Sequence, residues 1–307
     1  MRVKSAKYLI VIAGPTAVGK TGFTVNLGSE LNTSVINADS RQVYHELTIG
    51  TAKPGPTDLE GVVHYFIGDR TLDTDFNAGI FERESMVVLD QIFKVSSTAI
   101  LSGGSGLYIK AVCEGFDEFP DVNPKIRLEL KQEFESAGLE PLKNELEQKD
   151  PVFFEKVDVS NSQRIIRALE VIRTSGQPFS NFRIQAQSKR SFTTIKIGLE
   201  RPRQELYDRI NLRVDSMIEM GLIDEVKKLK RYRNKQALQT VGYQEIFGYL
   251  DGNYDRDEAI RLLKRNSRRY AKRQMTWFKA DTNIKWFHPD EFDQVVQYIN
   301  QELNVKY

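Results

Sequence analysis

The sequence has a single cysteine, Cys113, and three histidines among its 307 residues. One thiol excludes an internal disulfide and any zinc site that needs several cysteine ligands. His45, His64 and His288 are scattered, and none has another His or Cys at metal-ligand spacing, so we expect them to be structural. Cys113 lies in an apolar segment and is expected to be an inert, buried thiol.

Long apolar runs and an excess of one charge are also missing. The longest early apolar run, Tyr8–Ala13, is far too short to span a bilayer and leads into a glycine loop instead of a cleavage site. We therefore expect a cytoplasmic protein that has no membrane contact. The 44 Lys and Arg nearly cancel the 42 Asp and Glu, so any affinity for a polyanion must come from local clusters.

Apolar residues make up 40% of the chain, which is long enough for a hydrophobic core and a second lobe. Short apolar runs that end at glycine loops are typical of a parallel sheet buried on both faces. Between the first two runs, residues 20–31 have a helical pattern. We therefore predict an α/β fold, a P-loop-type parallel sheet flanked by helices, with strands at 7–13, 34–37, 98–102, 193–199 and 285–287.

The pattern changes between the third and fourth of these strands. Residues 121–148 are charged and helical in period, and residues 162–173 have apolar side chains at helical spacing. No strand signal interrupts this stretch. We therefore predict a helical insertion at 118–192 within an α/β core formed by residues 1–117 and 193–307.

Residues 14–21, GPTAVGKT, fit the phosphate-loop pattern G-x-x-x-x-G-K-[ST] at every fixed position. They follow a buried strand and precede a helix, which is the context that this pattern requires. Backbone N–H groups of such a loop close around a diphosphate, Lys20 adds a positive charge, and the Thr21 hydroxyl can ligate Mg²⁺. The loop predicts phosphate binding without identifying the phosphate compound.

An ATPase typically has an acidic residue at the end of a hydrophobic strand to help hold Mg²⁺. The strand at 98–102 ends without one, and Asp39, after the second strand, is the comparable carboxylate. Because ligands bind at the carboxyl ends of parallel strands, Asp39 and Ser105 should both face the phosphate loop. Asp39 could serve as a general base, help to order a metal, or simply cap a helix.

Six further motifs follow the phosphate loop: residues 39–44 (DSRQVY), 49–54 (IGTAKP), 103–108 (GGSGLY), 164–170 (RIIRALE), 241–243 (VGY) and 271–277 (AKRQMTW). In this order they resemble the motifs of the bacterial tRNA dimethylallyltransferases, over nearly the whole chain. The first two are the most specific to that family. Ser105 departs from the family, which often has Thr there, but it keeps the hydroxyl.

The resemblance implies transfer of a dimethylallyl group from dimethylallyl diphosphate to N6 of the adenosine just 3′ of a tRNA anticodon. Mg²⁺ would be the cofactor, and no obligate protein partner is evident. Asp39 would take the N6 proton, Thr21 would ligate the metal, and Arg213 would contact the diphosphate. The implied diphosphate-binding residues are Gly14, Thr16, Ala17, Val18, Gly19, Lys20, Thr21, Arg209 and Arg213.

Arg209 and Arg213 are four residues apart and so share a helix face, although solvated arginines paired with Glu205 or Asp208 are the alternative.

Residues 261–279 contain eight basic residues and no acid. Seven of these fall on one half of a helix, with Leu263, Tyr270, Trp277 and Phe278 opposite. We expect the apolar half to pack on the core and the basic half to face tRNA phosphates, unless it is merely solvated.

The target base must leave the anticodon loop to reach a buried diphosphate, so residues 39–42 should line its pocket. The full set of implied contacts to the anticodon loop is Asp39, Ser40, Arg41, Gln42, Ser105, Arg127, Gln163, Arg164, Arg167, Gln239, Gly242, Gln244, Arg268 and Lys272. Alternatives are a P-loop small-molecule kinase, a prenyltransferase that acts on free adenine nucleotides, and an RNA-binding protein that uses a nucleotide as a switch. The last would need a γ-phosphate sensor, which the sequence does not show.

Overall fold

The computed structural model describes residues 6–115, 117, 119–183 and 189–304. The chain divides into two compact units, Met1–Glu114 with Arg190–Tyr307, and Gly115–Lys189. The boundary predicted at residue 118 lies outside the described residues.

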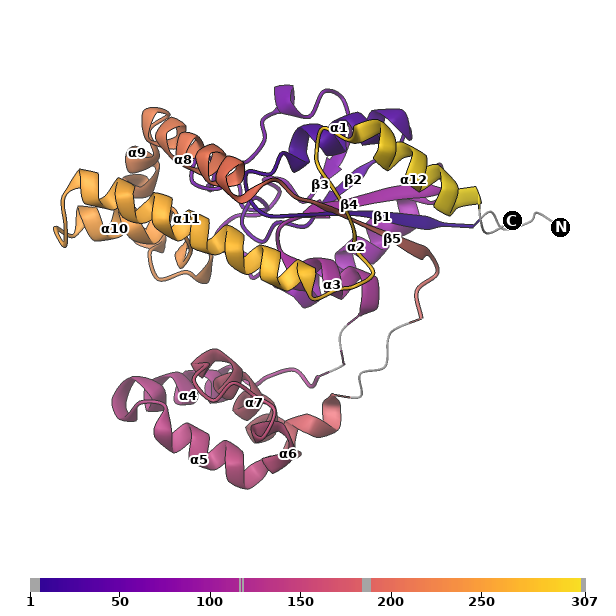
Figure 1. Ribbon diagram of the computed structural model, residues 1–307. Coiled ribbons are helices and arrows are strands. Elements are labelled where there is room, and N and C mark those ends of the chain that lie inside the picture. Colours follow the sequence, from indigo (N-terminus) through magenta and orange to yellow (C-terminus); the bar gives the residue numbers. More distant parts are fainter. Residues whose placement is uncertain (1–5, 116, 118, 184–188, 305–307) are drawn as a thin grey trace. The chain divides into compact units, whose positions relative to one another are not determined.

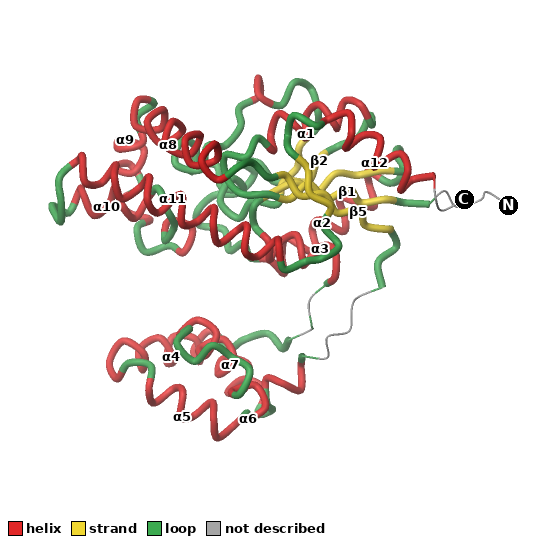
Figure 2. Tube along the Cα trace, in the orientation of Figure 1, coloured by secondary structure: helices red, strands yellow, loops and turns green. Residues whose placement is uncertain are grey.

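Among the described residues, a parallel sheet of six strands lies at the centre of the first unit (Figure 2, yellow). Its order is β3-β2-β4-β1-β5-β6, and all neighbours are parallel. This confirms the predicted α/β fold. The strands are β1 (Tyr8–Ala13), β2 (Val35–Asn37), β3 (His64–Tyr65), β4 (Thr98–Gly103), β5 (Thr193–Leu199) and β6 (Lys285–Phe287).

Helices cover both faces of the sheet (Figure 1). One face is covered by α1 (Lys20–Glu30) and α12 (Phe292–Asn304), and the other by α2 (Ala78–Ile92) and α3 (Gly106–Glu114). Every residue of β1 is buried, because the strand has a helical layer on each side. Within the described residues, no helix is long and apolar enough to cross a membrane.

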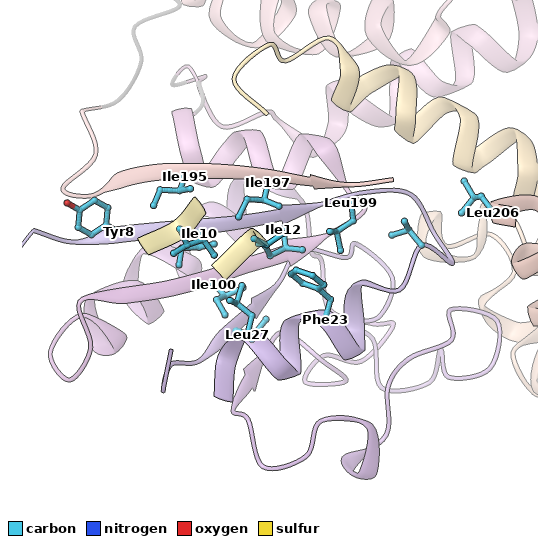
Figure 3. Close-up of a cluster of buried hydrophobic side chains, with 14 of the residues drawn as sticks. Tyr8, Ile10, Ile12, Phe23, Leu27, Ile100, Ile195, Ile197, Leu199 and Leu206 are labelled. Carbon is cyan, nitrogen blue, oxygen red and sulfur yellow. The ribbon is translucent and has the colours of Figure 1, made fainter. Parts of the chain in front are cut away.

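Alternate residues of the central strands build the core between the sheet and α1 (Figure 3). Ile10 and Ile12 of β1 and Ile197 of β5 are fully buried there. Phe23 and Leu27 of α1 pack against them. This packing fixes α1, and therefore the phosphate loop that precedes it, at the carboxyl end of β1.

Four helices pack together beyond the carboxyl ends of the strands (Figure 1). They are α8 (Arg203–Glu219), α9 (Leu222–Lys228), α10 (Tyr243–Leu250) and α11 (Arg256–Lys279). The apolar stripe of α8, Leu206, Ile210, Val214 and Met217, is buried as its spacing indicates. Short 3₁₀ turns occur at Pro56–Asp58, Lys230–Tyr232 and Gln236–Leu238.

The second unit, in its described residues, contains helices and loops (Figure 2). The helices are α4 (Pro124–Ala137), α5 (Glu140–Lys149), α6 (Pro151–Phe154) and α7 (Ser162–Ser175), followed by a 3₁₀ turn at Phe179–Phe182. The helical stretch predicted at 121–148 is two helices, because Gly138 ends α4 with a φ of 76°. Leu130, Leu146 and Leu169 belong to a core of this unit's own.

Candidate active site

The phosphate loop connects β1 to α1. Gly19 has a φ of 112°, a conformation that favours glycine, and α1 begins at the next residue. The Lys20 Nζ folds back and donates to the carbonyls of Gly14 (2.9 Å) and Pro15 (2.8 Å). Burial lowers the pKa of Lys20 to about 7; the carboxylate of Asp39 opposes this shift, and Arg213 adds to it. The Asp39 carboxylate therefore offsets only part of the cost of burying the Lys20 ammonium.

Arginines of α8 hold the phosphate loop from one side. Arg209 Nε donates to the Ala17 carbonyl (2.8 Å), and Arg213 Nη1 donates to Thr16 Oγ1 (3.3 Å). Arg213 Nη2 also donates to the Thr51 carbonyl (3.2 Å), and burial lowers the pKa of this guanidinium. The two arginines thus share a face directed at the loop.

The predicted carboxylate partners of these arginines are engaged elsewhere. Glu205 pairs with Arg201, and Asp208 accepts from Gln204. Arg201, which comes just before α8, donates from Nε to the Val18 carbonyl (2.8 Å). Three arginines therefore hold successive residues of the phosphate loop.

Asp39 lies in a turn after β2. Its Oδ1 accepts from the backbone N–H groups of Arg41 (2.9 Å) and Gln42 (3.2 Å). No helix begins there, so the helix-cap alternative is wrong, although the carboxylate does close a turn. The end of β4 lies close by: a Cβ on Gly103 would be 2.1 Å from the Ala38 carbonyl oxygen.

A cavity of about 480 Å³ brings these groups together. Its charged and polar lining includes Thr16, Lys20, Thr21, Asp39, Gln42, Arg209, Arg213, Tyr270 and Gln274. Its apolar lining includes Ile210, Val214, Met217 and Leu263. The cavity therefore combines a phosphate-binding end, a carboxylate and an apolar wall, which suits an anionic compound with a short hydrocarbon group.

The other predicted residues of this unit lie in the loops after β4 and before α10, and on helices α10 and α11. Ser105 bonds to the Asp39–Gln42 turn: its Oγ accepts from the Ser40 backbone N–H (3.1 Å) and donates to Ser40 Oγ (3.4 Å). Gly242 lines the cavity. Gln239 and Gln244 are exposed and hydrogen-bonded to each other (2.9 Å).

Arg41 and Gln42 anchor the same turn. Arg41 Nη1 donates to the Ser40 carbonyl (3.1 Å), and its buried Nε has no hydrogen-bond partner among the described residues. Gln42 Nε2 donates to the carbonyls of Thr51 (3.1 Å) and Ala52 (3.2 Å). The turn after β2 is thereby tied to the 49–54 motif.

Sequence reasoning missed two residues that shape the cavity. The Glu225 carboxylate of α9 accepts from the backbone N–H groups of Thr48, Ile49 and Gly50 (2.7–3.2 Å) and from the Tyr243 hydroxyl (2.8 Å). Glu225 had no local signal, because its backbone partners are about 175 residues away in the chain. Gln274, the second, lies inside the AKRQMTW motif.

Only some of the basic side chains of α11 are exposed without a partner on α8. Lys264 pairs with Asp215 of α8 (2.6 Å), and Arg268 donates to Asn211 of α8 (2.6 Å), whereas Lys272 is exposed. Leu263 and Phe278 are buried as expected. The prediction that Trp277 packs on the core is wrong: this side chain is 46% exposed and lies over Gly106 at the start of α3.

In the helical unit, Gln163 and Arg164 are exposed on α7. Arg167 and Arg127 both pair with Glu170, at 3.0 and 2.9 Å. Glu170 is buried, so the two guanidinium groups compensate a carboxylate that would otherwise be costly. Despite these ion pairs, part of the Arg127 side chain and part of the Arg167 side chain remain exposed on the surface of this unit.

Cys113 is buried, as expected, and burial raises the pKa of its thiol to about 12. In the part of the chain that the structure describes, no three His, Cys, Asp or Glu side chains form a metal-binding group. Mg²⁺ does not need one where phosphate oxygens and water supply most ligands. The exposed Thr21 hydroxyl and the Asp39 carboxylate line the same cavity and fit such a site.

The sequence profile of the IPP transferase family matches residues 42–281. The tRNA dimethylallyltransferase of Cytophaga hutchinsonii is 51% identical over 97% of this chain and 98% of its own length. The tRNA dimethylallyltransferase 1 of Bacteroides thetaiotaomicron is 45% identical over 95% of this chain and 94% of its own.

Solved structures give the same result. The full-length tRNA isopentenylpyrophosphate transferase from Bacillus halodurans aligns with a TM-score of 0.73 at 38% identity, over 98% of both chains. A eukaryotic dimethylallyltransferase acting on tRNA aligns with a TM-score of 0.80 at 26% identity, over 97% of this chain and 77% of its own.

Proposed function

The chain belongs to the IPP transferase family, a family of tRNA dimethylallyltransferases, and on this premise we propose how its cavity performs the transfer. The donor is dimethylallyl diphosphate, and the acceptor is N6 of the adenosine 3′ to the tRNA anticodon. One observation supports this most: the cavity holds a phosphate loop, two arginines, a carboxylate and an apolar wall within one enclosure.

In the proposed reaction the N6 nitrogen attacks the allylic carbon, and the bond from that carbon to the diphosphate oxygen breaks. N6 is a poor nucleophile because its lone pair is delocalised into the ring, and the attack leaves a proton to be removed. Asp39 takes that proton. Its Oδ1 is engaged by two backbone N–H groups, which orients the carboxylate and leaves Oδ2 to accept it.

The leaving diphosphate is stabilised by the other end of the cavity. The Thr16–Lys20 backbone and the Lys20 ammonium receive it, and Arg213 adds a second positive charge from α8. Arg209 supports the loop through the Ala17 carbonyl and contributes charge from the same helix face. Diphosphate departs without phosphoryl transfer, so the absence of an acidic residue at the end of β4 has a simple reason.

Thr21 would hold Mg²⁺ through its hydroxyl, with diphosphate oxygens and water as the other ligands. The metal would neutralise charge on the leaving diphosphate. Asp39 lines the same cavity as Thr21, and helping to order the metal would be its alternative role.

Contacts to tRNA are proposed for both units. In the first unit, residues 39–42 with Ser105 receive the extruded adenosine. Gln239, Gly242 and Gln244, just before and at the start of α10, border it, and Arg268 and Lys272 of α11 face the tRNA backbone. In the helical insertion, proposed at 118–192, Gln163, Arg164, Arg167 and Arg127 contact the anticodon arm. A cytoplasmic location agrees with a tRNA substrate.

The comparisons support this function over a small-molecule kinase and over a prenyltransferase of free nucleotides. The test is incubation with labelled dimethylallyl diphosphate, Mg²⁺ and either tRNA or AMP, followed by nucleoside analysis. Label should appear in N6-modified adenosine from tRNA. A tRNA with guanosine 3′ to the anticodon is the matched control and should remain unlabelled. Labelling of AMP at a comparable rate would overturn the polymer substrate.

A further inference from the structure

Gln274 lies towards the C-terminal end of α11, five residues before Lys279, and it is buried at 7% exposure. Its Oε1 accepts from the backbone N–H of Thr16 (2.9 Å), the third residue of the phosphate loop. Its Nε2 donates to the carbonyl of Gly104 (2.9 Å), in the loop after β4. One buried amide therefore joins three segments that are far apart in the sequence.

The contact between Gln274 and Gly104 excludes any larger residue at position 104. A Cβ on Gly104 would lie 2.3 Å from Gln274 Nε2, so the residue there must be glycine for the amide to keep its place. Both polar ends of the amide are satisfied by backbone groups. A buried amide whose ends are already bonded is poorly placed to read a nucleotide.

The Thr16–Ala17 turn needs such support. Ala17 has a φ of 64°, a left-handed conformation that is unfavourable for a residue with a Cβ and persists where neighbouring groups fix it. Arg209 and Arg213 hold this turn from α8, through the Ala17 carbonyl and the Thr16 hydroxyl. Gln274 holds it from α11, through the Thr16 N–H.

We propose that Gln274 is a positioning residue for the prenyl donor: it keeps the Thr16–Ala17 turn in the conformation that receives the diphosphate. This rests on the proposed function of the loop. The same bond ties the donor site to α11, on which Lys272 and Arg273 are exposed to solvent on either side of the buried face. Gln274 thus serves the donor even though its neighbours in the motif face outward.

The first test is Gln274→Leu, which keeps the approximate size of the side chain and removes both hydrogen bonds. Its KM for dimethylallyl diphosphate should rise about tenfold, as expected for leaving buried backbone groups unpaired, and its KM for tRNA should stay within about twofold. Calorimetry with inorganic diphosphate and Mg²⁺ should show the same loss without any turnover. The matched control is Thr276→Ala, since Thr276 is exposed and bonds within α11 to the Lys272 carbonyl.

The second test is Gln274→Glu, which also serves if the leucine variant fails to fold. The carboxylate can still accept from Thr16 but sets a second acceptor against the Gly104 carbonyl. Protonation restores a donor, so diphosphate affinity relative to the wild type should recover as the pH falls from about 8 to about 6. A merely structural residue would give no such recovery.

Unchanged diphosphate affinity in Gln274→Leu would overturn the positioning role, as would a rise in the KM for tRNA alone. The latter would make Gln274 a tRNA contact. Failure of the proposed function would look different, because the wild type itself would then transfer no prenyl group to tRNA.

Discussion

At the scale of single residues, Asp39 has the most demanding task, since the proposed reaction needs one proton acceptor beside N6. Asp39→Asn retains an oxygen for the Arg41 and Gln42 N–H groups and so should retain the turn. It cannot accept the proton. We expect turnover to fall by roughly 10²- to 10⁴-fold, with both dissociation constants little changed.

Turnover and the affinities for donor and tRNA, measured with a Mg²⁺ titration, separate the roles of Asp39. Weaker donor binding that extra Mg²⁺ partly restores would assign it to metal ordering. Near-normal turnover would remove it from the mechanism.

Lys20 gives a prediction about pH. Burial lowers its pKa to about 7, and this pKa should rise when a diphosphate binds beside the side chain, because the anion favours the charged ammonium. The contribution of Lys20 to binding is therefore complete below about pH 7 and is lost as the pH rises towards the higher pKa of the bound state. Diphosphate binding should take up protons near pH 8.

Calorimetry in buffers of different ionisation enthalpy measures that uptake. The control is Lys20→Arg, which keeps a positive charge but does not titrate in this range. Equal proton uptake by the two proteins would place the titration on the ligand rather than on Lys20.

At the scale of elements, Glu225 connects α9 to the 48–50 loop and to α10. Glu225→Ala leaves three backbone N–H groups and the buried Tyr243 hydroxyl without their acceptor, so we expect a loss of about 2 kcal/mol in the free energy of unfolding. Tyr243→Phe should cost about 1 kcal/mol. Urea denaturation of the two variants tests this, and unaltered midpoints would contradict the account.

On α7, Arg164 and Arg167 offer a contrast. Arg164→Ala should weaken tRNA binding and lower its salt dependence by about one counterion, while leaving donor affinity alone. Arg167→Ala should do the same and also lower the melting temperature, because the buried Glu170 keeps one partner fewer. Binding isotherms at several salt concentrations and thermal melts give both readouts. Equal loss of donor affinity would count against separate sites.

Some secondary-structure elements could be predicted from the sequence and others could not. The bounds of β5 and β6 and the stripe of α8 were predictable, because they depend on local apolar patterns. The short strand β3 was not, since two residues carry no periodicity. The position of Trp277 was predicted wrongly, because a helical wheel gives the direction of a side chain but not how completely its neighbours cover it. Trp277 lies against Gly106 at the start of α3 and stays 46% exposed.

The site followed the same division. Gly14–Thr21 and Asp39 could be identified from local sequence, since a strand end and a loop pattern fix their position. Three other contacts join residues more than 170 positions apart: Arg209 with the Ala17 carbonyl, Glu225 with the Gly50 N–H, and Gln274 with the Thr16 N–H. No local pattern encodes such partners, because tertiary packing alone brings α8 and α11 to the phosphate loop and α9 to the 48–50 loop.

At the scale of the whole molecule, each unit has its own core, and the residues that line the proposed donor cavity all belong to the first unit. Changes in the helical unit should therefore act on tRNA and spare the donor. The phosphate loop should bind a compound that supplies its own leaving group, so the reaction needs no nucleoside triphosphate.

The central claim is that this phosphate loop serves prenyl transfer and not phosphoryl transfer. The most direct measurement is the ratio of diphosphate released to dimethylallyl group fixed on tRNA, in a reaction that contains Mg²⁺ and no ATP. The account predicts a ratio of about one, and loss of both products when excess chelator removes the metal. A strict requirement for ATP, or undiminished transfer in excess chelator, would contradict it.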